Sequence, residues 1–77
     1  MKYQLLDTVV LDHDLPASFL CRGDLGTVVE TYEPDGLEVE FVTAAGRTAA
    51  LVTLTDSEVR SISNDDVISV RRHHRAQ

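Results

Sequence analysis

The feature that most constrains this chain is a series of short apolar and β-branched segments separated by turn residues. Residues 37–41 alternate between apolar and acidic side chains, which predicts a strand with one buried and one exposed face. Pro34, Asp35 and Gly36 precede this strand, and all three residue types favour tight turns. The expected strands are residues 8–11, 25–32, 37–42, 48–54 and 59–62. Such a series is typical of a small all-β domain.

The connections between these strands indicate how the sheet is organised. A long loop over residues 12–24 follows the first strand, and three of its apolar residues are expected to cover one end of the core: Leu15, Phe19 and Leu20. Thr55 and Glu58 have the spacing of a capping box, which predicts one short helical turn before the last strand. Five strands with these connections describe a small SH3-like barrel, in which strong bending hides the sheet edges. An OB-type barrel is the alternative, although that fold usually needs a longer chain and a helix between its third and fourth strands.

The SH3-like barrel domain is expected to occupy residues 1–62, and residues 63–77 form a C-terminal extension. In one interpretation, apolar residues of the extension form an extra edge strand: Val67, Ile68 and Val70. In the other, Asn64 and the two acids after it cap a short helix. Beyond Arg72 we expect a frayed basic tail, because chain ends are usually poorly ordered unless they are docked.

Size and charge disfavour several classes of function. A chain of 77 residues buries only about 60–65% of its unfolded surface, which leaves little room for a deep active-site cleft. All 13 acidic residues lie within residues 1–66 beside four basic ones, a net charge of −9. This charge repels phosphate backbones, so nucleic acid is not the expected partner of the body. The same charge favours a protein partner with a basic surface.

The sequence also predicts a cytoplasmic protein that does not associate with membranes. No apolar run approaches the roughly 20 residues that a membrane-spanning helix needs. Asp7 interrupts the first apolar stretch too early for a signal peptide. Cys21 is the single cysteine, so no disulfide can form within the chain, and a reducing compartment is the simplest environment.

The second and third predicted strands suggest a partner-binding site that consists of Glu30, Tyr32, Glu38 and Glu40. A three-residue loop at residues 34–36 would place Glu30 opposite Glu40 on the outer face. The same register would place Val29 opposite Phe41 in the core. Like charges directly opposite each other lower stability, and local conflicts of this kind are expected at functional sites. We therefore expect the three glutamates to meet a basic partner, with Tyr32 as an aromatic anchor.

Three other candidate sites have simpler interpretations. Adjacent metal-ligand side chains rarely converge on one ion, and no distant histidine or cysteine completes a set with Asp12, His13 and Asp14. Cys21 follows two apolar residues and is expected to pack as a small hydrophobic side chain. Residues 22–24, Arg-Gly-Asp, are expected to form the turn into the second strand. No P-loop, dinucleotide fingerprint or nucleophile elbow occurs, so we expect no enzyme activity, metal or cofactor.

Several segments taken in order resemble an uncharacterised family of small bacterial proteins, a domain of unknown function. The segments are Leu6–Leu11, Asp14–Pro16, Arg22–Val29, Glu38–Phe41 and Thr53–Leu54. The resemblance covers residues 5 to about 62 and implies an SH3-like fold without assigned catalytic residues. Small barrels of this type near toxin genes are often immunity proteins or antitoxins, which is an analogy at the level of the fold.

We therefore expect a non-catalytic protein-binding module. The specific hypothesis is an immunity or antitoxin-like protein that neutralises a basic partner through its acidic surface. One alternative is a KOW-like module that binds RNA or the ribosome through Arg71, Arg72 and Arg75. Another alternative is an accessory subunit that covers one edge of a larger enzyme.

Overall fold

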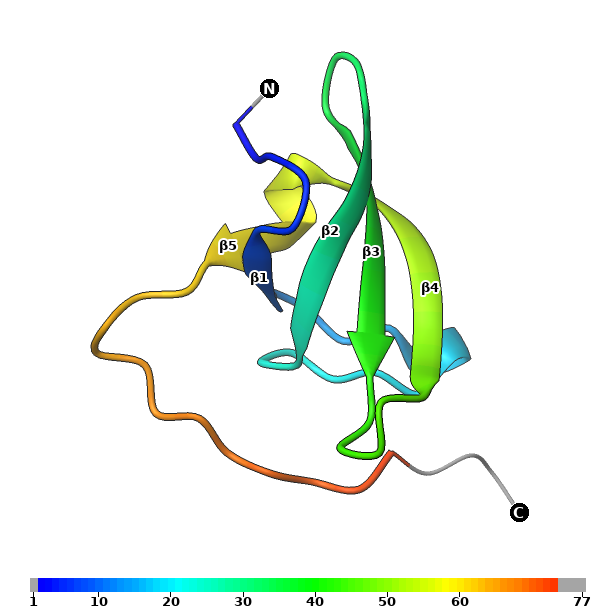
Figure 1. The fold of residues 1–77 in the computed structure, drawn as a ribbon, viewed down its shortest axis with the longest axis vertical. Coiled ribbons are helices and arrows are strands. Elements are labelled where there is room, and N and C mark those ends of the chain that lie inside the picture. Colours follow the sequence, from blue (N-terminus) through cyan, green and yellow to red (C-terminus); the bar gives the residue numbers. More distant parts are fainter. Residues whose placement is uncertain (1, 74–77) are drawn as a thin grey trace.

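Five antiparallel strands form a single sheet in the computed structural model, which describes residues 2–73 (Figure 1). The strands are β1 (Thr8–Leu11), β2 (Leu25–Tyr32), β3 (Gly36–Val42), β4 (Thr48–Thr55) and β5 (Val59–Ser61). They lie side by side in the order β4-β3-β2-β1-β5. Two short 3-10 turns complete the described elements, η1 (Pro16–Ser18) in the long first loop and η2 (Asp56–Glu58) before β5.

The predicted all-β class, the five strands and the helical turn before the last strand are confirmed. The bounds of β1 and β2 agree with the prediction, and those of β3, β4 and β5 differ from it by one residue. The predicted capping box is also present, because the Thr55 backbone N–H donates to Glu58 Oε1 at 2.8 Å. The sheet does not close, since no pairing between β4 and β5 occurs within residues 2–73. The fold is therefore an open, strongly bent sheet rather than a closed barrel.

The core lies on one face of this sheet and follows the alternation of β3. Leu37, Val39 and Phe41 of β3 are buried, as are apolar residues of every other strand. Leu20 of the long loop is buried and Leu15 packs against the core, as predicted. Phe19 differs from the prediction, because its side chain is 36% exposed and contacts the C-terminal segment instead.

The predicted register between β2 and β3 is wrong. Tyr32 pairs with Gly36, so the hairpin loop is residues 33–35 and Gly36 is the first residue of β3. A β-bulge then falls between Val28 and Glu30, which leaves Val29 as an extra residue on β2. Val29 is consequently exposed and does not lie opposite Phe41.

The C-terminal extension differs from both predicted forms, since its described residues, 63–73, contain neither a strand nor a helix. They leave β5 and run as an open arch past the lower end of β2 and β3 (Figure 1). His73 does not show the fraying expected beyond Arg72, because its ring is hydrogen-bonded to Ser18. The rest of the predicted frayed tail, residues 74–77, lies outside the described residues. No helix within residues 2–73 is long and apolar enough to cross a membrane.

Gly26 permits close packing between β2 and the inward-facing residues of β3. A Cβ atom at this position would lie 2.5 Å from Val39 Cγ1 and 2.9 Å from Phe41 Cε2. Gly26 is not part of the β-bulge, which lies further along β2 at Val29. The missing side chain at Gly26 instead makes room for the inward-facing residues of β3.

We predict that Gly26→Ala lowers the free energy of unfolding by about 1–3 kcal/mol, because the added methyl group overpacks the core. Urea denaturation followed by circular dichroism measures the loss. Val39→Ala removes one of the clashing atoms, so the double variant should lose less stability than the two single losses combined. Strict additivity would contradict this explanation of Gly26.

Candidate functional site

The four predicted partner-binding residues lie on the outer face of the sheet, opposite the core. Glu38 and Glu40 alternate with the buried residues of β3, so both point outward. Glu30 pairs with Glu38 rather than with Glu40, and Tyr32 pairs with Gly36. The bulge at Val29 shifts the pairing but keeps Glu30 and Tyr32 on this outer face. The structure therefore brings together the four residues although the predicted register was wrong.

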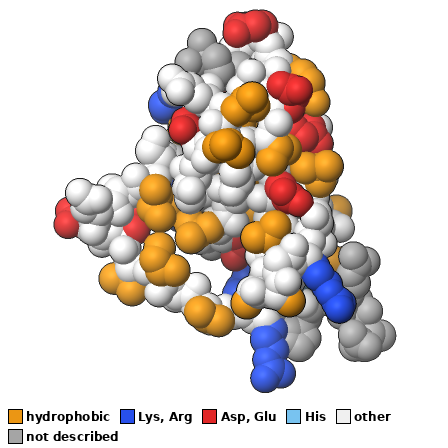
Figure 2. All heavy atoms as spheres, in the orientation of Figure 1, with side chains coloured by type: hydrophobic (Ala, Val, Ile, Leu, Met, Phe, Trp, Pro, Cys, Tyr) orange, Lys and Arg blue, Asp and Glu red, His pale blue; other side chains and the backbone are white. Residues whose placement is uncertain are grey.

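This acidic face has no basic residue on its own strands, because β2, β3 and β4 contain neither lysine nor arginine. Glu33 and Asp35 of the hairpin loop extend the negative charge beyond the ends of β2 and β3. Figure 2 shows acidic side chains running from the tip of this hairpin down the face, with hydrophobic side chains beside them. Most of the lysine and arginine side chains visible in that view lie at the opposite, lower end of the molecule.

Hydrogen bonds hold the acidic side chains on this face. Thr53 Oγ1 donates to Glu38 Oε1 at 2.7 Å, and Thr48 Oγ1 donates to Glu40 Oε2. The Thr31 backbone N–H donates to Glu30 Oε1 at 3.1 Å. Each of the three carboxylates uses one oxygen in these bonds, which leaves the other oxygen to accept from an incoming cation. The threonines of β4 thus orient the two β3 carboxylates without neutralising them.

Exposed apolar side chains lie among these carboxylates. Tyr32 is 46% exposed, Leu51 of β4 is 55% exposed, and Val29 is 37% exposed. Leu51 lies directly opposite Glu40 on the neighbouring strand. Sequence reasoning missed Leu51 and assigned Val29 to the core. Leu51 shares its strand face with Thr53 and Thr55, opposite the buried Leu54, so the period-two alternation of β4 is the signal that could have found it.

Asp12, His13 and Asp14 do not converge on a common point. Asp12 forms an ion pair with Arg22 at 3.3 Å, and Asp14 Oδ1 accepts from the Arg22 backbone N–H at 2.8 Å. The His13 ring lies 2.8 Å from Glu58 Oε2. These contacts connect the start of the long loop to Arg22 near its end and to Glu58 of η2. No group of three or more metal-ligating side chains occurs among residues 2–73.

The loop that contains Cys21 corrects one prediction and confirms another. Cys21 is exposed rather than packed in the core. Its backbone N–H donates to Asp24 Oδ2 at 2.8 Å, and Gly23 adopts a positive φ of 97°. Residues 22–24 therefore form the turn into β2, as predicted.

The C-terminal segment places Arg71 against the body. Arg71 forms a bidentate ion pair with Asp24, in which Nε donates to Oδ1 at 3.0 Å and Nη2 to Oδ2. This carboxylate raises the pKa of Arg71 further above its ordinary value. Arg71 also donates to the Phe19 backbone carbonyl at 3.2 Å. One of the three arginines predicted to form a basic tail is thus already paired, and Arg75 lies outside the described residues.

The fold and its outer face define a class: small open-sheet domains that present acidic and apolar side chains on one surface. The model of the family described as Domain of unknown function (DUF4926) matches residues 5–61, and the chain belongs to that family. This agrees with the extent of the resemblance in the sequence. No curated protein and no solved structure matches the chain significantly.

Glu58 provides a pH-dependent contact between η2 and the long loop. Its pKa is lowered from the ordinary value of 4.5, chiefly because the Thr55 backbone N–H donates to the carboxylate. The adjacent His13 ring lowers it further, while partial burial opposes the effect. Because the pKa is lower in the folded state, the stabilisation is present above the unfolded pKa and is lost as the pH falls through the folded one.

We predict that Glu58→Gln makes the stability less dependent on pH below about 4.5, because glutamine keeps a capping acceptor but cannot be protonated in this range. At pH 7 the variant should lose about 1 kcal/mol or less. Urea denaturation of both proteins between pH 3 and pH 7 measures the two profiles. Parallel profiles would show that Glu58 contributes nothing to the acid sensitivity.

Proposed function

We propose that this protein is a non-catalytic protein-binding module of SH3-like type, and that its acidic face docks onto a basic surface of another protein. The observation that carries the proposal is the face of β2–β4, where three oriented carboxylates surround exposed apolar side chains and no basic residue lies on these strands. Exposed apolar groups among charges of one sign suit a partner with basic and aromatic groups.

The specific form of the proposal is an immunity or antitoxin-like protein of a bacterial cytoplasm. In that role the acidic face would occupy the phosphate-binding surface of a basic partner such as a nuclease. Glu30 lies directly opposite Glu38, and their repulsion is relieved when a cation binds between them. Association should therefore be fast at low ionic strength and slow at high ionic strength.

The geometry favours this function over the KOW-like alternative. RNA binding through the tail would need free arginines, and Arg71 is already paired with Asp24. The acidic body would also repel the phosphate backbone. An accessory subunit of a larger enzyme would use the same face, so the acidic surface is the common element of the two protein-binding forms.

We predict that the double variant Glu30→Lys/Glu38→Lys binds a lysine-rich, tyrosine-containing peptide at least about tenfold more weakly than the unchanged chain. The reason is that two carboxylates that attract the lysines of the peptide become ammonium groups that repel them. Isothermal titration calorimetry at 20 mM and 200 mM salt measures both affinity and salt dependence. NMR titration of the unchanged chain should shift the amide signals of the acidic face: Glu30, Tyr32, Glu38, Glu40 and Leu51.

The matched control is Asp12→Lys/Asp65→Lys, which changes the net charge equally at two positions outside the acidic face. This control should lose much less affinity than the variant of the acidic face. Equal losses in the two variants would show that the peptide responds only to net charge, and the proposed site would then be wrong. Circular dichroism of both variants checks that the sheet is retained.

A further inference from the structure

The arch of residues 63–73 displays an apolar segment that the body does not cover. Val70 is 95% exposed and Val67 is 89% exposed, the two most exposed large hydrophobic side chains of the described chain. Ile68 between them is 59% exposed. Figure 2 shows hydrophobic side chains along this arch and an opening between the arch and the sheet. Three β-branched apolar residues in four positions would ordinarily be expected in a buried strand.

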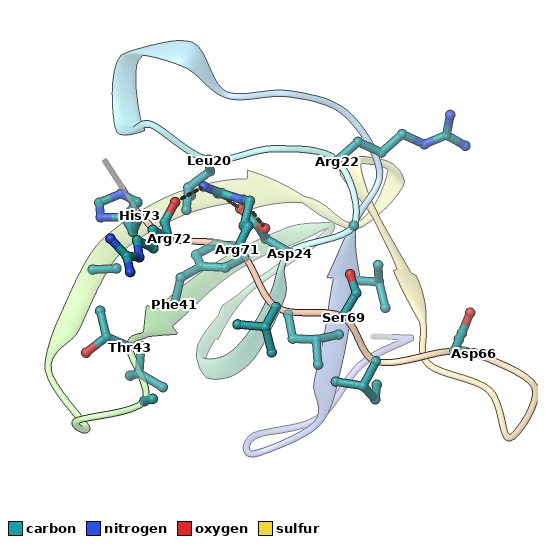
Figure 3. A pocket seen from close by; sticks show the side chains of 18 of the residues that line it. Leu20, Arg22, Asp24, Phe41, Thr43, Asp66, Ser69, Arg71, Arg72 and His73 are labelled. Carbon is teal, nitrogen blue, oxygen red and sulfur yellow. Dashed lines mark hydrogen bonds and ion pairs between the residues drawn. The ribbon is translucent and has the colours of Figure 1, made fainter. Parts of the chain in front are cut away.

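The backbone of this segment is also unpaired. Within residues 2–73, no backbone–backbone hydrogen bond involves residues 67–73. A cavity of ≈ 850 Å³ separates the segment from the body, and its lining includes Val10, Leu25 and Val42 (Figure 3). The segment therefore offers backbone donors and acceptors together with apolar side chains, which are the two requirements for pairing with another strand.

Ion pairs at both ends hold the segment in this position. Asp66 accepts two hydrogen bonds from Arg60, each at 3.0 Å, and one from the Ser63 backbone N–H at 2.7 Å. Arg71 is fixed to Asp24 at the other end, and His73 packs edge-on against Phe19 with ring centroids 6.2 Å apart. The chain between these anchors is thus positioned before any partner arrives, which lowers the entropic cost of binding.

The charge pattern of the segment identifies a partner. Residues 65–72 read Asp-Asp-Val-Ile-Ser-Val-Arg-Arg, with two acids, a largely apolar centre and two bases. Two such segments side by side in parallel would place like charges together. In the antiparallel arrangement, the acids of each copy meet the bases of the other. The segment is therefore complementary to itself in one orientation only.

We propose that the protein forms a two-fold dimer in which residues 66–72 of two copies pair as antiparallel strands centred on Ser69. In a symmetric antiparallel pair, the residue on the two-fold axis lies opposite the same residue of the second copy. Ser69 is the small residue at the centre of the segment and takes this position. In this register Ile68 lies opposite Val70 of the second copy, and Asp66 lies opposite Arg72 of the second copy. Both pairs fall on the same face, so the apolar centre is flanked by Arg72 of one copy and Asp66 of the other. Asp66 Oδ1 accepts one hydrogen bond from Arg60 and can accept a second from the incoming Arg72.

The rest of the molecule supports a second copy at this position. The body carries a net charge of −9 over residues 1–66, so contacts between two bodies are repulsive. Residues 67–77 contain three arginines and no acid, so this end of one copy is attracted to the acidic body of another. Arg72 has no side-chain hydrogen bond or ion pair to residues 2–73, so its guanidinium is available to the partner. A strand pair of this length buries little surface, so the dimer should be weak and concentration-dependent.

Sedimentation velocity of the full chain tests the association directly. Between about 10 µM and 1 mM, the apparent mass should rise from 8.5 kDa toward twice that value. The double variant Ile68→Ser/Val70→Ser should remain monomeric over this range. The control Leu5→Ser, at a residue that is 56% exposed near the N-terminus, should dimerise like the unchanged chain. A chain that remains monomeric at 1 mM would overturn the proposal.

Disulfide trapping tests the register. In a Cys21→Ser background, Ser69→Cys should form a cross-linked dimer under mild oxidation, because central residues of an antiparallel pair lie about 4.5–5.5 Å apart at Cα. Val67→Cys is the matched control and should cross-link much more slowly, since it lies opposite Arg71 of the second copy. Equal cross-linking at both positions indicates parallel or non-specific contact and contradicts the antiparallel dimer. The two variants change only the exposed arch, so both should fold, and circular dichroism verifies this.

Discussion

The alternation of apolar and acidic residues along β3 is the constraint on which the rest of the structure depends. Leu37, Val39 and Phe41 supply the centre of the core, and the same pleat forces Glu38 and Glu40 onto the opposite face. A slip of one residue would bury the carboxylates and expose the apolar side chains, so the register of this strand is strongly determined. The core and the acidic face are therefore two consequences of one pattern. A small domain with little interior cannot alter one without altering the other.

The bulge at Val29 changes both faces of the sheet, and it contributes an exposed apolar residue to the face on which the proposed function depends. It removes one valine from the core and adds an exposed apolar side chain beside Glu30. The resulting surface combines carboxylates with apolar groups, whereas a regular ladder would have left it more uniformly polar. Bulges increase the local twist of a strand, which also helps this sheet to bend around its core, although its edge strands β4 and β5 do not pair with each other within residues 2–73.

Carboxylates have different partners in the two parts of the molecule. On the sheet, threonine hydroxyls orient the carboxylates of β3, and no ion pair to residues 2–73 neutralises them. In the C-terminal arch, Asp66 pairs with Arg60, and Arg71 pairs with Asp24. These charges are therefore compensated within the chain. These arch contacts are exposed and contribute little to the stability of the fold. Their main effect is positional, because they hold an apolar segment in an exposed position away from the body.

The sequence by itself determined the all-β class, the five strands to within one residue at each end, the capping box and the acidic character of the outer face. These features follow from local properties, namely the period of the apolar residues, turn chemistry and charge. Tertiary structure alone decided the β2–β3 register, the exposure of Val29 and Cys21, and the position of the arch. Each of these depends on contacts between distant residues: the packing of Gly26 against β3, or the pairing of Arg71 with a residue 47 positions earlier in the chain. Local preference cannot specify such contacts, because several arrangements satisfy the same pattern until the core is packed.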